Sequence, residues 1–99
     1  MTTNARDLVG LEAFARDGGR IGKVKDIICD EGSSAECLVI KYGLFRDLVV
    51  PADVVQEKGD GVTVPFTQAF LDVAPRVGSK GKLSSSDAAR LERFFHPVS

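Results

Sequence analysis

The hydrophobic pattern of the first two thirds of the chain consists of short apolar runs, separated by turns rich in glycine, proline and acidic residues. Short runs enriched in Val and Ile are typical of β-strands, and their regular spacing favours a barrel or sandwich over alternating strands and helices. The pattern therefore predicts six strands. We expect them at residues 8–14, 20–29, 37–42, 44–50, 54–57 and 62–64.

The second of these strands organises the predicted sheet. Gly18 and Gly19 precede it and supply the positive φ that a tight hairpin turn requires. Gly22 lies inside the strand, where a glycine often marks a bulge or a bend at which another strand passes close. A bent strand in the middle of three antiparallel strands allows so small a sheet to curl into a barrel.

The pattern changes after Pro65. Thr67 has the side chain of a helix N-cap, and a short helix over residues 68–73 must end by Pro75, because a residue before proline avoids the helical conformation. The stretch 76–82 is basic and contains glycine. It is therefore predicted to be a solvated linker.

A second, amphipathic helix is predicted near the C-terminus. Ser84 and Asp87 have the spacing of an N-terminal capping pair, and Pro97 ends the segment. An apolar stripe follows one side of this helix and comprises Ala88, Leu91, Phe94 and Phe95. The stripe must be buried, and two ways remain open: the helix packs on its own barrel, or it packs on a second copy of the chain.

Composition and charge narrow the class of protein. The 99 residues suit one domain with one modest core, and the apolar fraction of 43% is that of an ordinary globular protein. The 14 acidic and 13 basic residues nearly cancel, which argues against a general nucleic-acid footprint. No apolar run approaches the ~20 residues of a membrane span, and the N-terminus lacks a signal peptide's apolar region. We expect a cytoplasmic protein without membrane insertion.

Two cysteines flank the acidic loop between the second and third predicted strands. Cys29 and Cys37 are either a redox-sensitive pair that faces across a hairpin or two small buried apolar side chains. The only histidine is His96, near the C-terminus, so the four closely spaced ligands of a structural zinc site are missing. We therefore expect neither a metal nor a cofactor.

No group of residues in the sequence has the character of a catalytic site. A nucleophile with its base, a tuned carboxylate pair or a metal would be needed. Asp26, Asp30 and Glu31 form an acidic cluster, which is interpreted either as ordinary loop residues, with Asp26 bonded to the backbone, or as a weak cation site. The glycines between the first strands do not open a helix and so form no nucleotide-binding motif. We expect a protein that is not an enzyme.

Several separate segments together resemble the PRC-barrel family. They are DLVGL at 7–11, DGGRIGKVKDI at 17–27, LVIKYG at 38–43, LVVPA at 48–52 and VTVPFT at 62–67. The family includes the cytoplasmic domain of the photosynthetic reaction centre H subunit, the barrel domain of a ribosome-maturation factor that binds a small-subunit protein, and stand-alone members of unknown role. The C-terminal tail is similar to the extension of some stand-alone members.

The resemblance implies a fold and leaves the activity open. The implied fold is mainly β: a small, six-stranded, strongly bent antiparallel barrel at 7–75, with a short helix after the last strand. A linker and an amphipathic helix follow at 76–99. Such a bent sheet is incomplete, and the resemblance implies no catalysis.

The leading functional hypothesis is a non-catalytic protein-interaction module that self-associates as a symmetric dimer. The candidate interface is a set of apolar side chains: Leu44, Phe45, Leu91, Phe94 and Phe95. One alternative is a ribosome-maturation or RNA-processing adaptor, which would show a basic stripe made of Arg20, Lys23, Lys25 and Lys41. Another alternative is an assembly barrel on a membrane complex. The identity of a protein partner is left open, and nucleic-acid binding is not expected.

Overall fold

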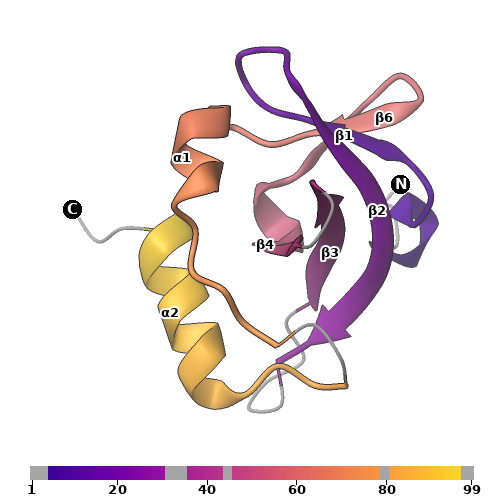
Figure 1. Cartoon of the computed structure of the whole chain (residues 1–99). Helices are drawn as coiled ribbons and strands as arrows, with labels where there is room; N and C mark the ends of the chain where they lie inside the picture. The colour runs from indigo at the N-terminus through magenta and orange to yellow at the C-terminus, as the bar shows by residue number, and fades with distance from the viewer. Residues whose placement is uncertain (1–4, 31–35, 44–45, 79–80, 97–99) are drawn as a thin grey trace.

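Six strands and two α-helices make up the computed structural model, which describes residues 5–30, 36–43, 46–78 and 81–96 (Figure 1). The strands are β1 (Glu12–Phe14), β2 (Arg20–Cys29), β3 (Glu36–Tyr42), β4 (Arg46–Pro51), β5 (Gln56–Lys58) and β6 (Gly61–Thr63). The α-helices are α1 (Gln68–Asp72) and α2 (Ser85–Phe95), and two 3-10 turns are η1 (Ala5–Leu8) and η2 (Ala52–Val54). The prediction of a mainly β chain with two late helices is confirmed.

The six strands form one sheet in the order β4-β3-β2-β1-β6-β5. Neighbouring strands are antiparallel, except that β6 runs parallel to β1. The predicted all-antiparallel barrel is therefore wrong in this pairing, and the sheet is mixed and not closed. The prediction was of a sheet in which all neighbouring strands are antiparallel. Instead, the last strand, β6, pairs with the first strand, β1, and the two run in the same direction. As a result, β4 and β5 lie at opposite edges of the sheet, although β5 follows β4 in sequence.

The first strand is shorter than predicted. Leu8 ends the turn η1, and Gly10 has a φ of 97°, which interrupts an extended chain. The approach to β1 is nevertheless bonded to β2, because the Gly10 amide donates to the Val24 carbonyl at 2.7 Å and the Val24 amide donates to the Leu11 carbonyl at 2.9 Å. The fifth strand also starts later than predicted, at Gln56, because η2 occupies the residues before it.

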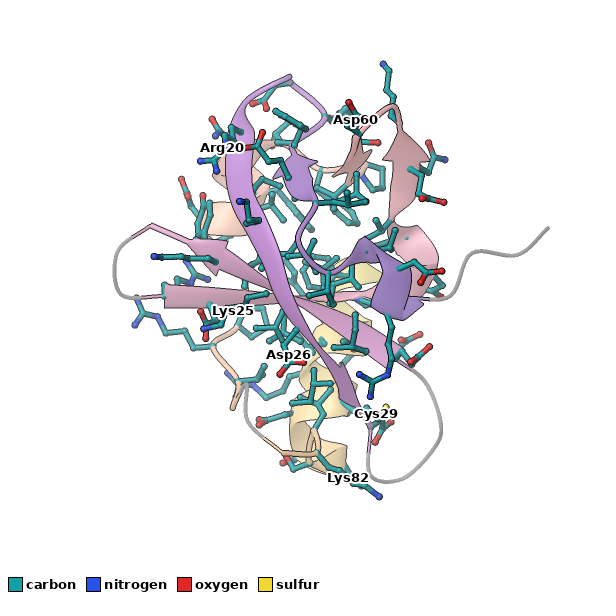
Figure 2. The ribbon with its side chains drawn as sticks, turned by 90° about the vertical axis from the view of Figure 1, so that its right-hand side faces the viewer. Arg20, Lys25, Asp26, Cys29, Asp60 and Lys82 are labelled. Atoms are coloured by element: carbon teal, nitrogen blue, oxygen red, sulfur yellow. The ribbon has the colours of Figure 1, made fainter. Side chains whose placement is uncertain are left out.

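The long strand β2 lies between β1 and β3, as predicted, and reaches from Arg20 at one end of the molecule to Cys29 at the other (Figure 2). Its pairing with each neighbour contains a register shift. At Gly22, a Cβ atom would lie 1.7 Å from the Lys41 carbonyl oxygen of β3. Only glycine fits so close a backbone approach, which confirms the interpretation of Gly22.

Both helices begin at the predicted N-caps. The Thr67 hydroxyl accepts a hydrogen bond from the Phe70 amide at 3.3 Å, and the Ser84 hydroxyl accepts one from the Asp87 amide at 3.2 Å. These bonds satisfy amides that the first helical turn leaves without partners. The local capping signals in the sequence are therefore sufficient to place both helix starts.

The helix α2 packs on the sheet of its own chain, against β4. Leu91 and Phe95 are 2% and 3% exposed, and Phe95 lies in an aromatic cluster with Phe66, Phe70 and Phe94. The ring centroids of Phe70 and Phe94 are 4.3 Å apart. Of the two ways to bury the apolar stripe, the structure shows packing within the chain, with α1 and α2 on the same side of the sheet (Figure 1).

Candidate functional site

A pocket of about 260 Å³ lies where the ends of β2 and β4 and the start of β3 meet α2. We call it the acidic pocket. It is lined by Asp30, Glu36, Cys37, Pro51, Ala52, Asp53, Leu83, Ala88, Leu91 and Glu92. Ligand pockets usually span about 300–1,000 Å³, so this one has the size of a single side chain or a small molecule.

The pairing of β-strands brings distant parts of the sequence to this pocket. Cys37 of β3 pairs with Pro51 of β4, and Glu36 pairs with Cys29 of β2. The Leu83 amide donates to the Cys29 carbonyl at 2.7 Å, which holds the segment before α2 against the end of β2. The first turns of α2 then add Ala88 to the wall.

The pocket combines an apolar floor with four carboxylates. Cys37, Pro51, Leu83 and Leu91 are buried. The carboxylates come from four different parts of the fold: Asp30 after β2, Glu36 of β3, Asp53 of η2 and Glu92 of α2. Such a pocket can hold a group that is apolar along its length and positively charged at its end.

Among the described residues, Glu36 and Glu92 make no ion pair. Asp53, in contrast, contacts His96, with 3.3 Å between Oδ1 and Nε2. This contact joins η2 to the end of α2, where His96 is the C-cap residue. Glu36 and Glu92 are therefore the carboxylates best placed to accept a charged group from outside.

The thiol on the floor is held neutral. Burial, and then the carboxylates of Asp30 and Asp53, raise the pKa of the Cys37 thiol to about 11. A cysteine is nucleophilic only as the thiolate. At neutral pH Cys37 therefore serves as part of the apolar floor.

The two cysteines do not face each other. Cys29 lies opposite Glu36, and Cys37 lies opposite Ile28, so the two thiols point to opposite faces of the sheet. Both are free. The hypothesis of a facing redox pair is therefore wrong. It required Cys29 and Cys37 to lie directly opposite each other, whereas the register of β2 and β3 is shifted by one residue from that pairing.

The acidic cluster predicted from the sequence is divided. The Asp26 carboxylate accepts a hydrogen bond from the Ile27 amide at 2.8 Å, as its backbone-bonding interpretation predicted. Asp30 lines the acidic pocket, and Glu31 lies outside the described residues. Within the described ranges, no three His, Cys, Asp or Glu side chains converge closely enough to hold a metal ion.

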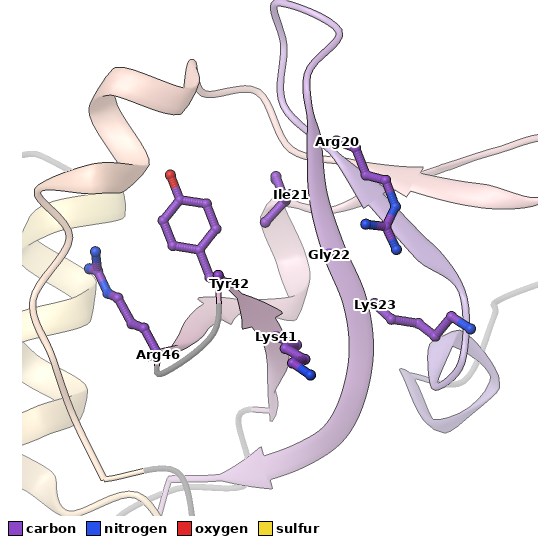
Figure 3. A pocket seen from close by; sticks show the side chains of 8 residues that line it. Arg20, Ile21, Gly22, Lys23, Lys41, Tyr42 and Arg46 are labelled. Carbon is purple, nitrogen blue, oxygen red and sulfur yellow. The ribbon is translucent and has the colours of Figure 1, made fainter.

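A second, more open hollow lies at the other end of the same strands. We call it the basic groove. It has a volume of about 750 Å³ and is lined by Arg20, Ile21, Gly22, Lys23, Lys41, Tyr42, Gly43 and Arg46. Figure 3 shows Tyr42 and Arg46 on one side of the opening, whereas Arg20 and Lys23 extend from the far side of β2. The positive charges thus surround the groove rather than converge inside it.

Two of the cations near the groove are free to contact a partner. Arg20 pairs with Glu12 at 3.1 Å, and Lys25, which does not line the groove, pairs with Asp47 at 3.2 Å. Lys23 and Lys41 are exposed and make no ion pair with another described residue. Three of the four residues of the predicted basic stripe therefore line the groove.

The fourth cation of the groove has a structural role. The Arg46 guanidinium donates to the carbonyls of Asp72 at 2.9 Å and Ala74 at 2.7 Å, and it lies 5.5 Å from the centre of the Tyr42 ring. The Tyr42 hydroxyl donates to the Asp72 carboxylate. Burial and then this hydrogen bond raise the pKa of Tyr42 to about 12. These contacts fasten the end of α1 to β3 and β4.

Two of the five residues of the predicted apolar interface are buried inside the chain. Leu91 and Phe95 are buried, and Leu91 also lines the acidic pocket. Phe94 is partly exposed and borders a shallow depression with Val73, which is 71% exposed. Leu44 and Phe45 lie outside the described residues. A shared face made of these five residues stays a prediction.

Comparison with known families gives a match over most of the chain. The family model of the PRC-barrel domain matches residues 2–71. The chain belongs to the PRC-barrel domain family. No curated protein matches the sequence. In the part of the chain that the structure describes, neither helix is long and apolar enough to cross a bilayer.

The basic groove and the acidic pocket differ in how much of each lies within the matched PRC-barrel domain. All six strands, and so the whole basic groove, lie within the matched PRC-barrel domain. The acidic pocket is closed by residues 83–92, which follow the matched region. The pocket is therefore built jointly by the PRC-barrel domain and the C-terminal helix of this chain.

Sequence reasoning missed three of the four pocket carboxylates: Glu36, Asp53 and Glu92. They are far apart in sequence. The pairing of β3 with β4 brings Glu36 and Asp53 to the pocket, and Glu92 joins them because α2 folds back onto the sheet. The available signal was positional, since Glu36 immediately precedes one predicted strand and Asp53 comes shortly after another. Antiparallel pairing brings such positions to one edge.

Proposed function

We propose that this chain is a non-catalytic protein-interaction module whose acidic pocket binds a basic side chain presented by a protein partner. The observation that carries this proposal is the arrangement of four carboxylates around an apolar floor in a pocket of about 260 Å³. A lysine or arginine matches both features, because its aliphatic stem packs on apolar surface while its charged end reaches carboxylates.

The chemistry of the pocket supports binding rather than catalysis. Its thiol, Cys37, is protonated at neutral pH because its pKa is raised to about 11. The pocket carboxylates come from four different parts of the fold, which suits a long cationic side chain better than a compact ion. Ion pairs at such a partly exposed rim contribute roughly 0.2–1 kcal/mol each, so binding is expected to be weak and selective for charge.

The test is a titration of the isotope-labelled chain with a tetralysine peptide, followed by amide NMR shifts. We expect shifts concentrated at Asp30, Glu36, Ala88 and Glu92. The double variant Glu36→Gln/Glu92→Gln should bind roughly tenfold more weakly, because it loses two carboxylates that have no ion pair among the described residues.

A matched control removes two carboxylates elsewhere. Asp7 and Asp60 are exposed and do not line the acidic pocket, so Asp7→Asn/Asp60→Asn should bind the peptide like the wild type. Shifts scattered over all acidic residues, or equal losses in both double variants, would contradict the proposal.

An RNA-linked adaptor is the second candidate function. The observation that favours it is the pair Lys23 and Lys41, which are exposed beside the basic groove. Binding of a short single-stranded RNA that weakens steeply with salt, and that is lost in Lys23→Gln/Lys41→Gln, would support this function. Unchanged amide spectra on addition of RNA would exclude it.

Self-association as a symmetric dimer is a further part of the proposal. Of the predicted interface, Phe94 is the partly exposed member among the described residues, beside exposed Val73. Val73→Glu places a charge in this patch without touching the core. If the dimer uses the patch, the variant sediments as a monomer at concentrations where the wild type is a dimer; equal sedimentation would exclude this apolar route.

A further inference from the structure

Charges on three adjacent strands are sorted by sign along the strand direction. One end of β2, β3 and β4 carries a cation and the other end carries a carboxylate. In β2 the cation is Arg20, at the start, and the carboxylate is Asp30, just after the end. In β3 the carboxylate is Glu36, at the start, and the cation is Lys41, near the end. In β4 the cation is Arg46, at the start, and the carboxylate is Asp53, shortly after the end. Because the strands are antiparallel, the order in sequence is reversed in β3, and all three cations therefore lie at one end of the sheet.

The sorting produces two charged surfaces on one molecule. The cationic ends line the basic groove, and the carboxylate ends line the acidic pocket. Figure 2 shows the separation along β2, with Arg20 and Cys29 at opposite ends. At a rise of about 3.3 Å per residue, Lys41 and Glu36 are roughly 17 Å apart along β3. Asp47 is a carboxylate at the cationic end, where it lies opposite Lys41 and forms an ion pair with Lys25.

We propose that the acidic pocket binds the basic groove of a second copy of this chain, with Lys23 and Lys41 as the side chains that reach the carboxylates around the pocket. The inference rests on the proposed function, since it names the source of the basic side chain. The net charge of -1 conceals two ends of opposite sign, so two copies attract when unlike ends meet and repel when like ends meet.

The choice of Lys23 and Lys41 follows from their contacts. Arg20 is held by Glu12, and Arg46 is held by two carbonyl groups. The two lysines are exposed and make no ion pair among the described residues. Their flexible stems match the apolar floor, and Glu36 and Glu92 are the corresponding carboxylates on the other surface.

Charges of opposite sign near each surface limit the affinity. Glu12 and Asp72 lie near the groove, whereas His96 contacts Asp53 and Lys82 adjoins Leu83 at the pocket. The contact is therefore expected to be weak and sensitive to salt. Two copies related by a two-fold axis can make it twice, which agrees with the symmetric dimer expected from the sequence.

The test uses complementary charge reversals of the full chain. One variant is Lys23→Glu/Lys41→Glu, and the other is Glu36→Lys/Glu92→Lys. Sedimentation velocity should show wild-type self-association at about 20 mM salt that weakens roughly tenfold or more at about 500 mM salt. Each variant alone should lose it, and an equimolar mixture should restore it, because reversed groove and reversed pocket are again complementary.

Two further variants distinguish a loss of association from a loss of folding. Lys41 lies opposite Asp47, so the reversal there places like charges side by side, and the neutral Lys23→Gln/Lys41→Gln should lose association without this repulsion. Arg16→Glu/Lys58→Glu reverses two exposed cations away from both surfaces and should associate like the wild type.

The outcome also separates this inference from the proposed function. A wild-type chain that stays monomeric at low salt, or folded variants whose mixture fails to associate, would overturn the inference. If the monomeric chain still binds tetralysine at the acidic pocket, the proposed function stands and the partner is a different protein. If the acidic pocket binds neither tetralysine nor a second copy of the chain, the proposed function and this inference are both wrong.

Discussion

Gly22 is the single residue on which the geometry of the sheet depends most directly. It lies in β2 where the Lys41 carbonyl of β3 approaches, beside the basic groove. The glycine thus determines both how closely the two strands cross and where the walls of the groove stand. Such a position can be predicted from sequence, because a glycine inside a strand often marks a bulge, a bend or a close approach of another backbone.

Substitution of Gly22 by alanine should therefore be costly. The added Cβ would lie 1.7 Å from a backbone oxygen, so β2 and β3 must separate. We expect Gly22→Ala to lower the free energy of unfolding by about 3 kcal/mol. Urea denaturation measures this change. Gly78→Ala is the control, since its Cβ would meet no atom within 4 Å, and a similar loss in both variants would contradict the explanation.

The raised pKa of the Cys37 thiol predicts that the stability of the fold depends on pH. Its folded-state pKa of about 11 exceeds the ordinary value of 9.0, so the unfolded chain loses the thiol proton first as pH rises. This contribution to stability is complete below about pH 9 and is lost between pH 9 and 11. The fall in unfolding free energy over this range should be smaller in Cys37→Ala than in Cys29→Ala, measured by denaturation at each pH. Equal falls would exclude a buried thiol.

Among the secondary-structure elements, those with local signals were predictable and those with distant partners were not. Thr67 and Ser84 cap their helices through bonds to residues three positions away, so the sequence contains the whole interaction. The parallel pairing of β1 with β6 joins Ala13 to Val62, and no local pattern specifies it. The predicted hairpin between Cys29 and Cys37 was slightly misplaced, which was enough to put the thiols on opposite faces.

The packing of α2 on its own sheet yields a prediction about stability. Phe95 is 3% exposed and contacts Phe66 and Phe70 as well as the neighbouring Phe94. Phe95→Ala should lower the unfolding free energy by about 3–5 kcal/mol, because it opens a cavity in this cluster. Arg93→Ala, on the exposed side of the same helix, should change it by less than about 0.5 kcal/mol. Thermal or urea unfolding checks both, and a silent Phe95→Ala would mean that α2 is not docked in solution.

For the chain as a whole, the overall charge is a poor guide to function. The near-cancellation of charges argued against a general nucleic-acid footprint, yet the structure gathers charges of each sign into a basic groove and an acidic pocket. Asp30 was noted from the sequence as one of an acidic cluster, but Glu36, Asp53 and Glu92 join it only after β3, η2 and α2 have packed. Sites assembled from distant elements in this way depend on tertiary structure and are not visible in local patterns.

The most direct test of the account is an intermolecular paramagnetic measurement at low salt. A nitroxide is attached to Arg20→Cys at the groove end, in a Cys29→Ser background, and mixed with isotope-labelled wild-type chain. The account predicts broadening of amide signals at the acidic pocket, around Glu36, Ala88 and Glu92, that disappears at high salt. Broadening centred instead on Val73 and Phe94, or none at any concentration, would contradict it.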